Sequence, residues 1–281
     1  MTLPVFVSKT LHHEAIDWAT RASANGGIIS TNTIRAVSAF CRDIDSAGIR
    51  NRFARFNPFA GGNLSGALTP LYRSFSFGGT VIGNATDTNS NFVSGDHAET
   101  GASGGLTGNG TNKYLLCGSV LASVDRANSH QAAYGSSLTS PATGARIFMG
   151  AESASGAGIV AFQVRDGAGA AILRYFSANS YNDYVNVSAA TSGFIVGSAV
   201  SSTDLRVYVD GVQSGSVQPI SRGAGAQTST SMAVFAWNSN GSILYHSAAR
   251  LSAYSVGLGL TAAQAAAYSR AIYSLQTALG R

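Results

Sequence analysis

Leu205-Arg-Val-Tyr-Val-Asp-Gly-Val-Gln-Ser-Gly215 is the stretch that decides the fold class. Apolar and polar side chains alternate through residues 205–209, which is the period-two pattern of a strand with one buried face. Asp210-Gly211 then supplies the dipeptide that two-residue hairpin turns prefer, because both residues tolerate a positive φ. This stretch therefore predicts an antiparallel β-hairpin.

Similar short runs, separated by Gly, Ser and Asn, fill the chain on both sides of this hairpin. A dozen short strands with turn residues between them favour an antiparallel two-sheet sandwich over about residues 106–257. We expect the fold to be mainly β. The predicted strands are Tyr114–Gly118, His130–Tyr134, Arg146–Ala151, Ile159–Val164, Ala171–Phe176, Tyr184–Val187, Gly193–Ala199, Leu205–Val209, Val212–Val217, Met232–Trp237, Ile243–Ser247 and Leu251–Val256.

Helices are predicted at both ends of the chain. Ser30-Thr31 can cap a helix that Gly48 closes, and a shorter helix is expected from about His12 to Arg21. Thr261-Ala-Ala-Gln264 is a capping box for a final helix over residues 261–279. The apolar face of the second helix should hold the following segment or a neighbouring subunit. That face consists of Ile34, Val37, Phe40 and Ile44.

The segment between the helices and the strands is long and rich in Gly, Ser, Thr and Asn. We interpret residues 60–112 as an extended connection with one or two short strands, around Tyr72–Phe77 and Asn91–Val93. Phe53–Phe59 is interpreted as an aromatic run ending in a turn. The predicted domains are an N-terminal helical segment (1–59), the extended segment (60–112) and a sandwich with a C-terminal helix (113–281). Alternatively, residues 60–281 form a single domain.

Composition limits the classes of partner. Charged residues make up 11% of the chain and the net charge is +5, with the arginines scattered apart from a loose cluster at Arg50, Arg52 and Arg55. This pattern does not indicate nucleic acid. Neither a secretory signal nor an apolar run long enough to span a membrane is expected. Cys41 and Cys117 are expected to be buried free thiols in a protein made in a reducing cytoplasm.

Residue patterns for catalysis and metal binding are mostly lacking. The chain has three Glu, widely separated, so the carboxylate pair of a glycoside hydrolase is not evident. Asp87-Thr-Asn-Ser-Asn91 is like the first half of a calcium loop, but Phe92 stands where glycine is required and no Glu follows at the twelfth position. We predict no enzyme, no cofactor and no metal.

Two segments combine aromatic rings with amide or carboxylate groups, as sugar sites do. The candidate carbohydrate-binding residues are Tyr181, Asp183, Tyr184, Trp237 and Asn238. The alternative is that Trp237 and Tyr184 cover the edge of the sandwich and the Asn residues form turns.

Four parts of the sequence together resemble a family of bacteriophage virion structural proteins with a concanavalin A-like or laminin-G-like lectin domain. These parts are Ser46–Ile49 with Phe56–Leu64 and Pro70–Tyr72; Asn91–Ser94 with Gly104–Tyr114; the Tyr208–Gly211 turn; and Ala253–Thr261 with the final helix ending at Arg281. The resemblance carries no catalytic residues.

The resemblance implies a structural component of a phage particle, either a tail fibre, a spike or a capsid-decorating protein, that acts in assembly or surface attachment. The implied partners are other virion proteins and further copies of this chain, with host-surface glycan as a further candidate and without nucleic acid or membrane. The implied location is the virion, after synthesis in the host cytoplasm. A carbohydrate-binding module for host glycan is the first alternative, and a laminarinase-like glycoside hydrolase is the second.

Overall fold

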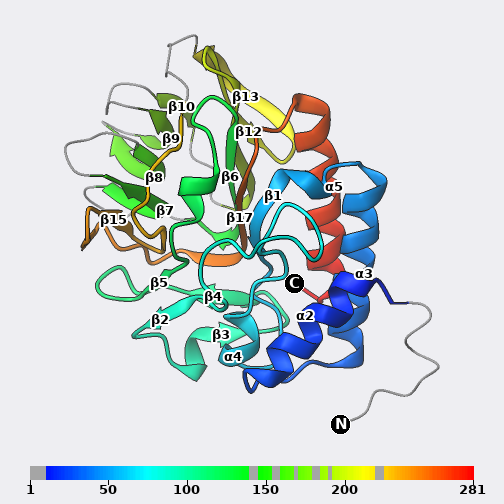
Figure 1. The fold of residues 1–281 in the computed structure, drawn as a ribbon. Helices are drawn as coiled ribbons and strands as arrows, with labels where there is room; N and C mark the ends of the chain where they lie inside the picture. Colours follow the sequence, from blue (N-terminus) through cyan, green and yellow to red (C-terminus); the bar gives the residue numbers. More distant parts are fainter. Residues whose placement is uncertain are drawn as a thin grey trace.

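The structure is a computed structural model that describes residues 11–138, 145–153, 159–167, 170–178, 184–188, 192–218 and 225–281. These residues form two β-sheets packed face to face, and helices cover the outer face of one sheet (Figure 1). The predicted fold, a mainly β two-sheet sandwich with N-terminal helices and a C-terminal helix, is confirmed. No helix of the described part of the chain is long and apolar enough to cross a membrane.

The first sheet contains the predicted hairpin and is centred on β17. On one side β17 pairs with β6, and on the other it pairs with β4 and β1, which lie end to end along it. The order is β13 (Val212–Gln218), β12 (Asp204–Val209), β11 (Gly193–Ser201), β6 (Ser129–Ser137), β17 (Arg250–Gly257), β4 (Gly105–Thr107) and β3 (His97–Ala98), with β1 (Phe53–Asn57) also on β17.

The second sheet forms the opposite layer of the sandwich. The order is β10 (Tyr184–Ser188), β9 (Ala170–Ala178), β8 (Ile159–Gly167), β7 (Ala145–Glu152), β14 (Ala233–Val234), β5 (Tyr114–Leu116) and β2 (Thr88–Ser90). Two further strands join it, β15 (Trp237–Ser239), which runs parallel to β7, and β16 (Ser242–Leu244), which pairs with β15.

The β12–β13 hairpin has the turn that its sequence predicts. Asp210 has φ 52° and Gly211 has φ 82°, the two positive values of a type I′ turn. The Asp210 carboxylate accepts hydrogen bonds from the Phe194 amide at 2.8 Å and from the Tyr273 hydroxyl at 2.6 Å. The turn is therefore fixed to β11 and to the final helix.

The first sheet is buried on both faces, which makes the molecule three layers deep. The inner core lies between the sheets and includes Leu205 and Val207. The helix-side core lies between the first sheet and the helices and includes Phe194 and Tyr208. Because successive side chains of a strand point to opposite faces, one strand contributes to both cores.

The helices begin and end close to the predicted positions. The Ser30 side chain caps α3 (Thr31–Ser46), and Thr261 with Gln264 forms the capping box of α5 (Ala262–Ala278). The first helix, α2 (His13–Ala24), extends three residues beyond the predicted end at Arg21. Shorter helical turns are α4 (Leu64–Ala67), η1 (Arg50–Arg52), η2 (Ser94–Asp96) and η3 (Val120–Ser123).

The apolar face of α3 is covered within the same chain. α3 packs on α2 and α5, and the Phe40 ring lies 4.7 Å from that of Phe56 on β1 and 6.3 Å from that of Tyr72. The predicted contact with the extended segment is made by the Phe40 ring against Tyr72, whereas α3 packs mainly on α5 and α2. Each large apolar side chain buried here contributes roughly 1.5–3 kcal/mol.

The aromatic run at residues 53–57 forms a strand, β1, that is buried along its whole length. Two short strands predicted in the extended segment are not formed. Tyr72–Phe77 is not a strand, since only Tyr72 forms an isolated bridge, to Phe56. Asn91–Val93 is not a strand either, because Asn91 has φ 66° and β2 ends at Ser90.

A buried ion pair joins β1 to the extended segment and to β17. The side chains of Arg55 and Asp87 are both 0% exposed, with Arg55 Nη2 2.7 Å from Asp87 Oδ1. The Tyr254 hydroxyl accepts from Arg55 Nε at 3.0 Å and donates to Asp87 Oδ1 at 2.7 Å. Asn57 Nδ2 donates to Asp87 Oδ2 at 2.7 Å. The Asp87 carboxylate is therefore occupied by protein groups and is not part of a calcium loop.

Arg55 remains charged in this setting. Burial by itself lowers the pKa of a guanidinium, but the neighbouring Tyr254 oxygen and the Asp87 carboxylate more than reverse this effect, and the pKa of Arg55 is raised. Arg55 Nη1 also donates to the Asn84 carbonyl at 2.9 Å and to the Ile82 carbonyl at 3.3 Å. The guanidinium thus has partners on each nitrogen, as a buried charge requires.

Replacing Asp87 with Asn should lower the free energy of unfolding by about 3–5 kcal/mol, because the variant leaves the Arg55 charge buried without a counter-ion. Urea unfolding followed by circular dichroism measures this loss. The matched control is Asp43→Asn, at an exposed position on α3, which should change the unfolding free energy by less than about 0.5 kcal/mol. Equal small effects of both substitutions would contradict a stabilising role for the pair.

Candidate functional site

The predicted carbohydrate-binding residues are only partly described. Tyr181 and Asp183 lie outside the described residues, and Tyr184 begins β10 without a described side chain. Trp237 and Asn238 are adjacent on β15. β15 and β10 lie on opposite sides of β7, four strand spacings apart, or roughly 19 Å. One sugar ring does not span the distance between these two strands. Because Tyr181, Asp183 and the Tyr184 side chain are not described, the five-residue site stays a prediction.

Trp237 and Asn238 are both used inside the fold. The Trp237 side chain belongs to a residue that is 7% exposed, and its ring stacks on Tyr245 with centroids 5.8 Å apart. Asn238 Nδ2 donates to the Ser231 carbonyl, and its Oδ1 accepts from the Gly241 amide, both at 2.8 Å. Such contacts are expected if the Trp237 ring covers the edge of the sandwich and Asn238 forms a turn, which was the alternative to a sugar site.

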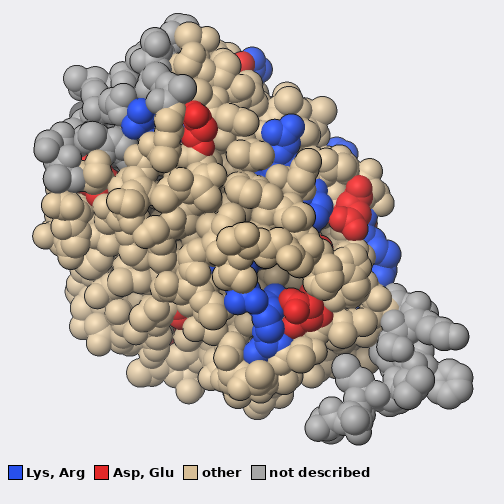
Figure 2. Space-filling view, viewed as in Figure 1, with Lys and Arg blue, Asp and Glu red and all other residues tan. Residues whose placement is uncertain are grey.

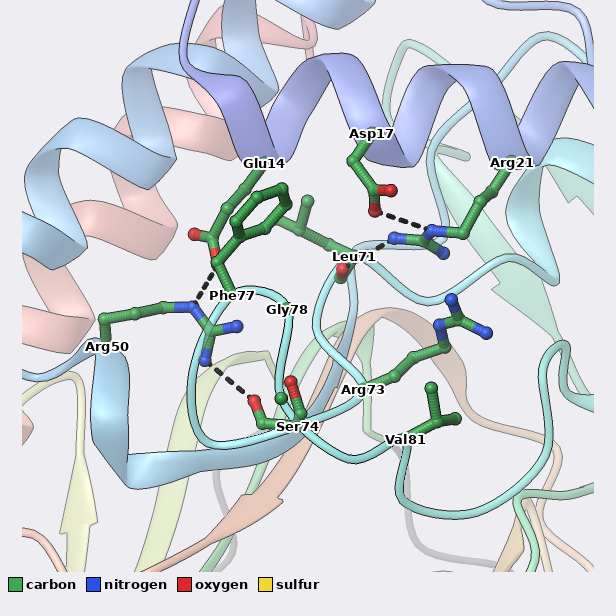
Figure 3. Close-up of a pocket in the computed structure, with 11 residues that line it drawn as sticks. Glu14, Asp17, Arg21, Arg50, Leu71, Arg73, Ser74, Phe77, Gly78 and Val81 are labelled. Carbon is green, nitrogen blue, oxygen red and sulfur yellow. Dashed lines mark hydrogen bonds and ion pairs between the residues drawn. The ribbon is translucent and has the colours of Figure 1, made fainter.

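A pocket at the junction of α2, η1 and the loop of residues 71–81 is lined by five charged side chains, more than the predicted sugar-binding segments contain (Figure 3). Its volume is about 190 Å³. Charged side chains are sparse on the face in Figure 2, and a group of basic and acidic side chains lies together over α2. Eleven residues line the pocket: Glu14, Asp17, Arg21, Arg50, Leu71, Arg73, Ser74, Phe77, Gly78, Gly79 and Val81.

Two of the three pocket arginines are fixed in place by the protein. Arg50 Nε lies 2.6 Å from Glu14 Oε1, Nη1 donates to the Ser74 carbonyl at 2.9 Å, and the guanidinium carbon lies 3.9 Å from the centroid of the Tyr72 ring. Arg21 Nε lies 2.7 Å from Asp17 Oδ2, and its terminal nitrogens donate to the carbonyls of Pro70 and Leu71.

Arg73 is the third arginine and differs from the other two. Its guanidinium extends from the opposite wall toward Arg21 and makes no hydrogen bond or ion pair with the described residues (Figure 3). Burial, followed by the positive charge of Arg21, lowers the pKa of Arg73. A cation held in this way is stabilised by a bound anion, because an opposite charge offsets both effects.

An apolar rim borders the arginines. Phe77 is 54% exposed and Val81 is 52% exposed, and the Phe77 ring meets that of His13 edge-on with centroids 4.5 Å apart. A second cavity of about 330 Å³ shares Glu14, Arg50 and Phe77 with the pocket. The two cavities are therefore neighbours, with the Phe77 ring and the Glu14–Arg50 pair in the lining of both.

Metal binding is not favoured beside this pocket. His12, Glu14 and Cys41 place one potential ligand atom each within 4.8 Å of one another. His12 Nε2 is bonded to Asp45 at 2.8 Å, and the Arg50 cation sits 2.6 Å from Glu14 Oε1. A positive guanidinium on the same carboxylate opposes a second cation, and we assign no metal to these residues.

The carboxylates of the three Glu residues are engaged in structural contacts. Glu14 is ion-paired with Arg50, and Glu99 accepts from the Thr33 hydroxyl and the Gly61 amide. Glu152 accepts from the Ser239 hydroxyl. Glu14 and Asp17 are the two carboxylates in the pocket, and each is paired with an arginine. This arrangement can hold an anion, but it does not leave a free acid and a free base facing each other.

Sequence reasoning missed the pocket because its parts come from three separate segments. Arg50 and Glu14 are 36 residues apart, and Arg21 reaches the carbonyls of residues 70 and 71. The available signal was the loose arginine cluster at residues 50–55 followed by Arg73, Phe75 and Phe77 in a loop rich in Ser and Gly.

Comparison with known proteins finds remote structural similarity and no sequence match. No protein-family model and no curated protein sequence matches the chain. A Trypanosoma rangeli sialidase in complex with 2,3-difluorosialic acid is 13% identical, with a TM-score of 0.49 over 84% of this chain and 39% of the sialidase. The chain thus spans well under half of that enzyme's length.

Two separately solved domains are also similar. Domain 4 of AbnA, a GH43 extracellular arabinanase from Geobacillus stearothermophilus, is 15% identical, with a TM-score of 0.41 over 78% of this chain and 98% of that domain. The Ruminococcus gnavus IT-sialidase CBM40 bound to α2,3-sialyllactose is 10% identical, with a TM-score of 0.32 over 48% of this chain and 77% of that domain. Each of these TM-scores is below 0.5, so the likenesses carry no argument about this chain.

Replacing Trp237 with Ala should lower the free energy of unfolding by about 3–5 kcal/mol, the usual loss for a buried large aromatic. The control is Leu244→Ala on the neighbouring strand β16, where the side chain is 43% exposed and the expected loss is under about 1 kcal/mol. Thermal melts compare the two variants, and a glycan array compares each with the wild type. An unchanged melt together with lost glycan binding by Trp237→Ala would show that the ring is a binding platform instead.

Proposed function

We propose that the protein is a non-catalytic structural component of a bacteriophage particle, in which a lectin-like sandwich acts in assembly or surface attachment. A tail fibre, a spike and a capsid-decorating protein all fit this role. The observation that carries the proposal is that three of the segments that resemble phage virion proteins make contacts with the last one, which contains α5 and Arg281.

Arg281, at the end of the last segment, contacts the first two segments and Ser252 beside the last one. Its guanidinium donates to the carbonyls of Pro58 at 3.0 Å, Phe59 at 2.7 Å and Ser252 at 3.1 Å. A side chain on Gly104 would place its Cβ only 2.4 Å from Arg281 Cγ, so the glycine is needed for this approach. Burial lowers the pKa of Arg281 to about 10, which leaves it charged at neutral pH.

The remaining segment, the Tyr208–Gly211 turn, contacts the same helix. The Tyr273 hydroxyl on α5 donates to Asp210, and a Cβ on Gly211 would lie 3.0 Å from Ala266 Cα. Because residues far apart in the chain depend on one another here, the quoted segments behave as parts of a single structural unit. These contacts support our interpretation that the resemblance belongs to the folded domain as a whole and not to separate short segments.

A role without turnover is supported by the state of the carboxylates. The described Glu side chains are bound by Arg, Ser, Thr or backbone groups, and Asp87 is buried against Arg55. A laminarinase-like hydrolase needs two carboxyl groups facing its substrate at about 5–10 Å. We therefore rank the hydrolase behind the structural role and the carbohydrate-binding module.

Partners of the proposed component are other virion proteins and further copies of the same chain. Apolar side chains suited to such contacts stand out on the surface, with Ile28 63% exposed, Val93 61% exposed and Val212 71% exposed. The second candidate function, a carbohydrate-binding module for a host-surface glycan, is favoured by the arginine pocket and its exposed Phe77 ring. The two functions are compatible within one attachment protein.

The proposal predicts that the protein is found in particles and releases no product from polysaccharides. Immunogold labelling and mass spectrometry of particles purified from cells that carry the gene test the first part. Incubation with β-glucans, alginate and peptidoglycan, followed by a reducing-end assay, tests the second. Absence from purified particles, or product release that Glu14→Gln abolishes while Glu99→Gln does not, would overturn the proposal.

A further inference from the structure

We propose that the arginine pocket of Figure 3 binds the carboxylate of an acidic sugar within an oligosaccharide. This inference names a ligand class for the proposed surface-attachment role and rests on that role for its biological setting. The binding chemistry itself follows from the charge, the free donors, the size and the walls of the pocket.

The charge of the lining selects an anion with one negative charge. Three arginines and two carboxylates leave one uncompensated positive charge, at neutral pH, in a partly enclosed site. A carboxylate neutralises that charge, whereas a phosphate monoester, with close to two negative charges, exceeds it. The pocket therefore matches a uronic acid better than a sugar phosphate.

The free hydrogen-bond donors have the geometry that a carboxylate needs. The Arg73 guanidinium donates to none of the described residues. Arg50 donates from Nε to Glu14 and from Nη1 to the Ser74 carbonyl, which leaves Nη2 for a ligand. A guanidinium presents parallel N–H groups that match the two oxygens of a carboxylate, and such paired bonds are about twice as strong as neutral ones. Arg21 and Arg50 are held by protein carboxylates and carbonyls, so they are ordered before a ligand arrives.

The size and walls of the region suit sugar rings. A volume of about 190 Å³ corresponds to roughly six water molecules at ~30 Å³ each, which is close to one hexose ring. The adjoining cavity of about 330 Å³ has room for the next unit of the chain. Phe77, exposed and set edge-on to His13, offers the apolar face against which the C–H groups of a sugar pack.

A peptide carboxylate has the same charge, but the surroundings favour the sugar. The pocket is lined by α2, η1 and the 71–81 loop, and no described strand borders it. Extended peptides bind mainly by adding to a free strand edge or by laying a helix into an apolar groove. An aromatic ring above a cluster of guanidinium groups is instead suited to a ring that carries an acid.

Isothermal titration calorimetry with tetragalacturonate, a mannuronate tetramer and a hyaluronan tetrasaccharide tests the proposal. At least one of these should bind the wild type, and its methyl-esterified form, which keeps the rings and removes the charge, should bind at least tenfold more weakly. Arg73→Gln should weaken binding of the acid form at least tenfold, and Phe77→Ala severalfold. The matched control, Arg35→Gln at an exposed position on α3, should bind as the wild type does.

Failure of all three acids to bind the wild type would overturn the inference, as would equal binding by Arg73→Gln. Tighter binding of a phosphorylated sugar or of a short peptide with a free C-terminus would also overturn it. Incorporation of Arg73→Gln into particles is measured separately. A variant that enters particles normally but loses the sugar supports both proposals, whereas sugar binding by a protein absent from particles upholds this inference alone.

Discussion

The buried pair of Arg55 and Asp87 is the interaction on which the rest of the structure depends. It lies in the inner core with both side chains fully enclosed, and Tyr254 bonds to both partners. Arg55 belongs to β1, Asp87 to the extended segment and Tyr254 to β17, so three distant parts of the chain must meet before either charge is satisfied. An ion pair of this kind adds little net stability compared with apolar packing, but it strongly penalises arrangements that separate its partners.

The helices pack on the same strand, β1, that carries Arg55. β1 directs Arg55 into the inner core and the rings of Phe53 and Phe56 into the helix-side core. The Tyr268 ring on α5 meets the Phe53 ring edge-on with centroids 4.8 Å apart. The helices are therefore the third layer of the sandwich and not an appendage. They also build part of the arginine pocket, because Arg21 and Glu14 stand on α2 and Glu14 is ion-paired with Arg50.

Features determined by neighbouring residues could be predicted from the sequence. The hairpin turn follows from two residues that accept a positive φ, the helix ends from Ser30 and Thr261, and the strands of the sandwich from alternating side chains. β1 was missed because Arg55 occupies a position that points into the core, and only a partner 32 residues away makes such a charge acceptable there. The arginine pocket likewise depends on contacts between distant segments. Trp237 lies beside Asn238, as in a sugar-binding site, but its side chain is buried.

The central claim is that the helices, the extended segment and the sandwich form one cooperative unit. The chain has two tryptophans, Trp18 in the helix-side core and Trp237 on the second sheet, and they report on opposite layers. Urea unfolding of Trp237→Phe, followed by the fluorescence of Trp18, and of Trp18→Phe, followed by that of Trp237, tests the claim when each is compared with its own circular dichroism transition. The account predicts that fluorescence and circular dichroism coincide in both variants. A Trp18 transition that is complete while the β-sheet signal remains native would contradict it.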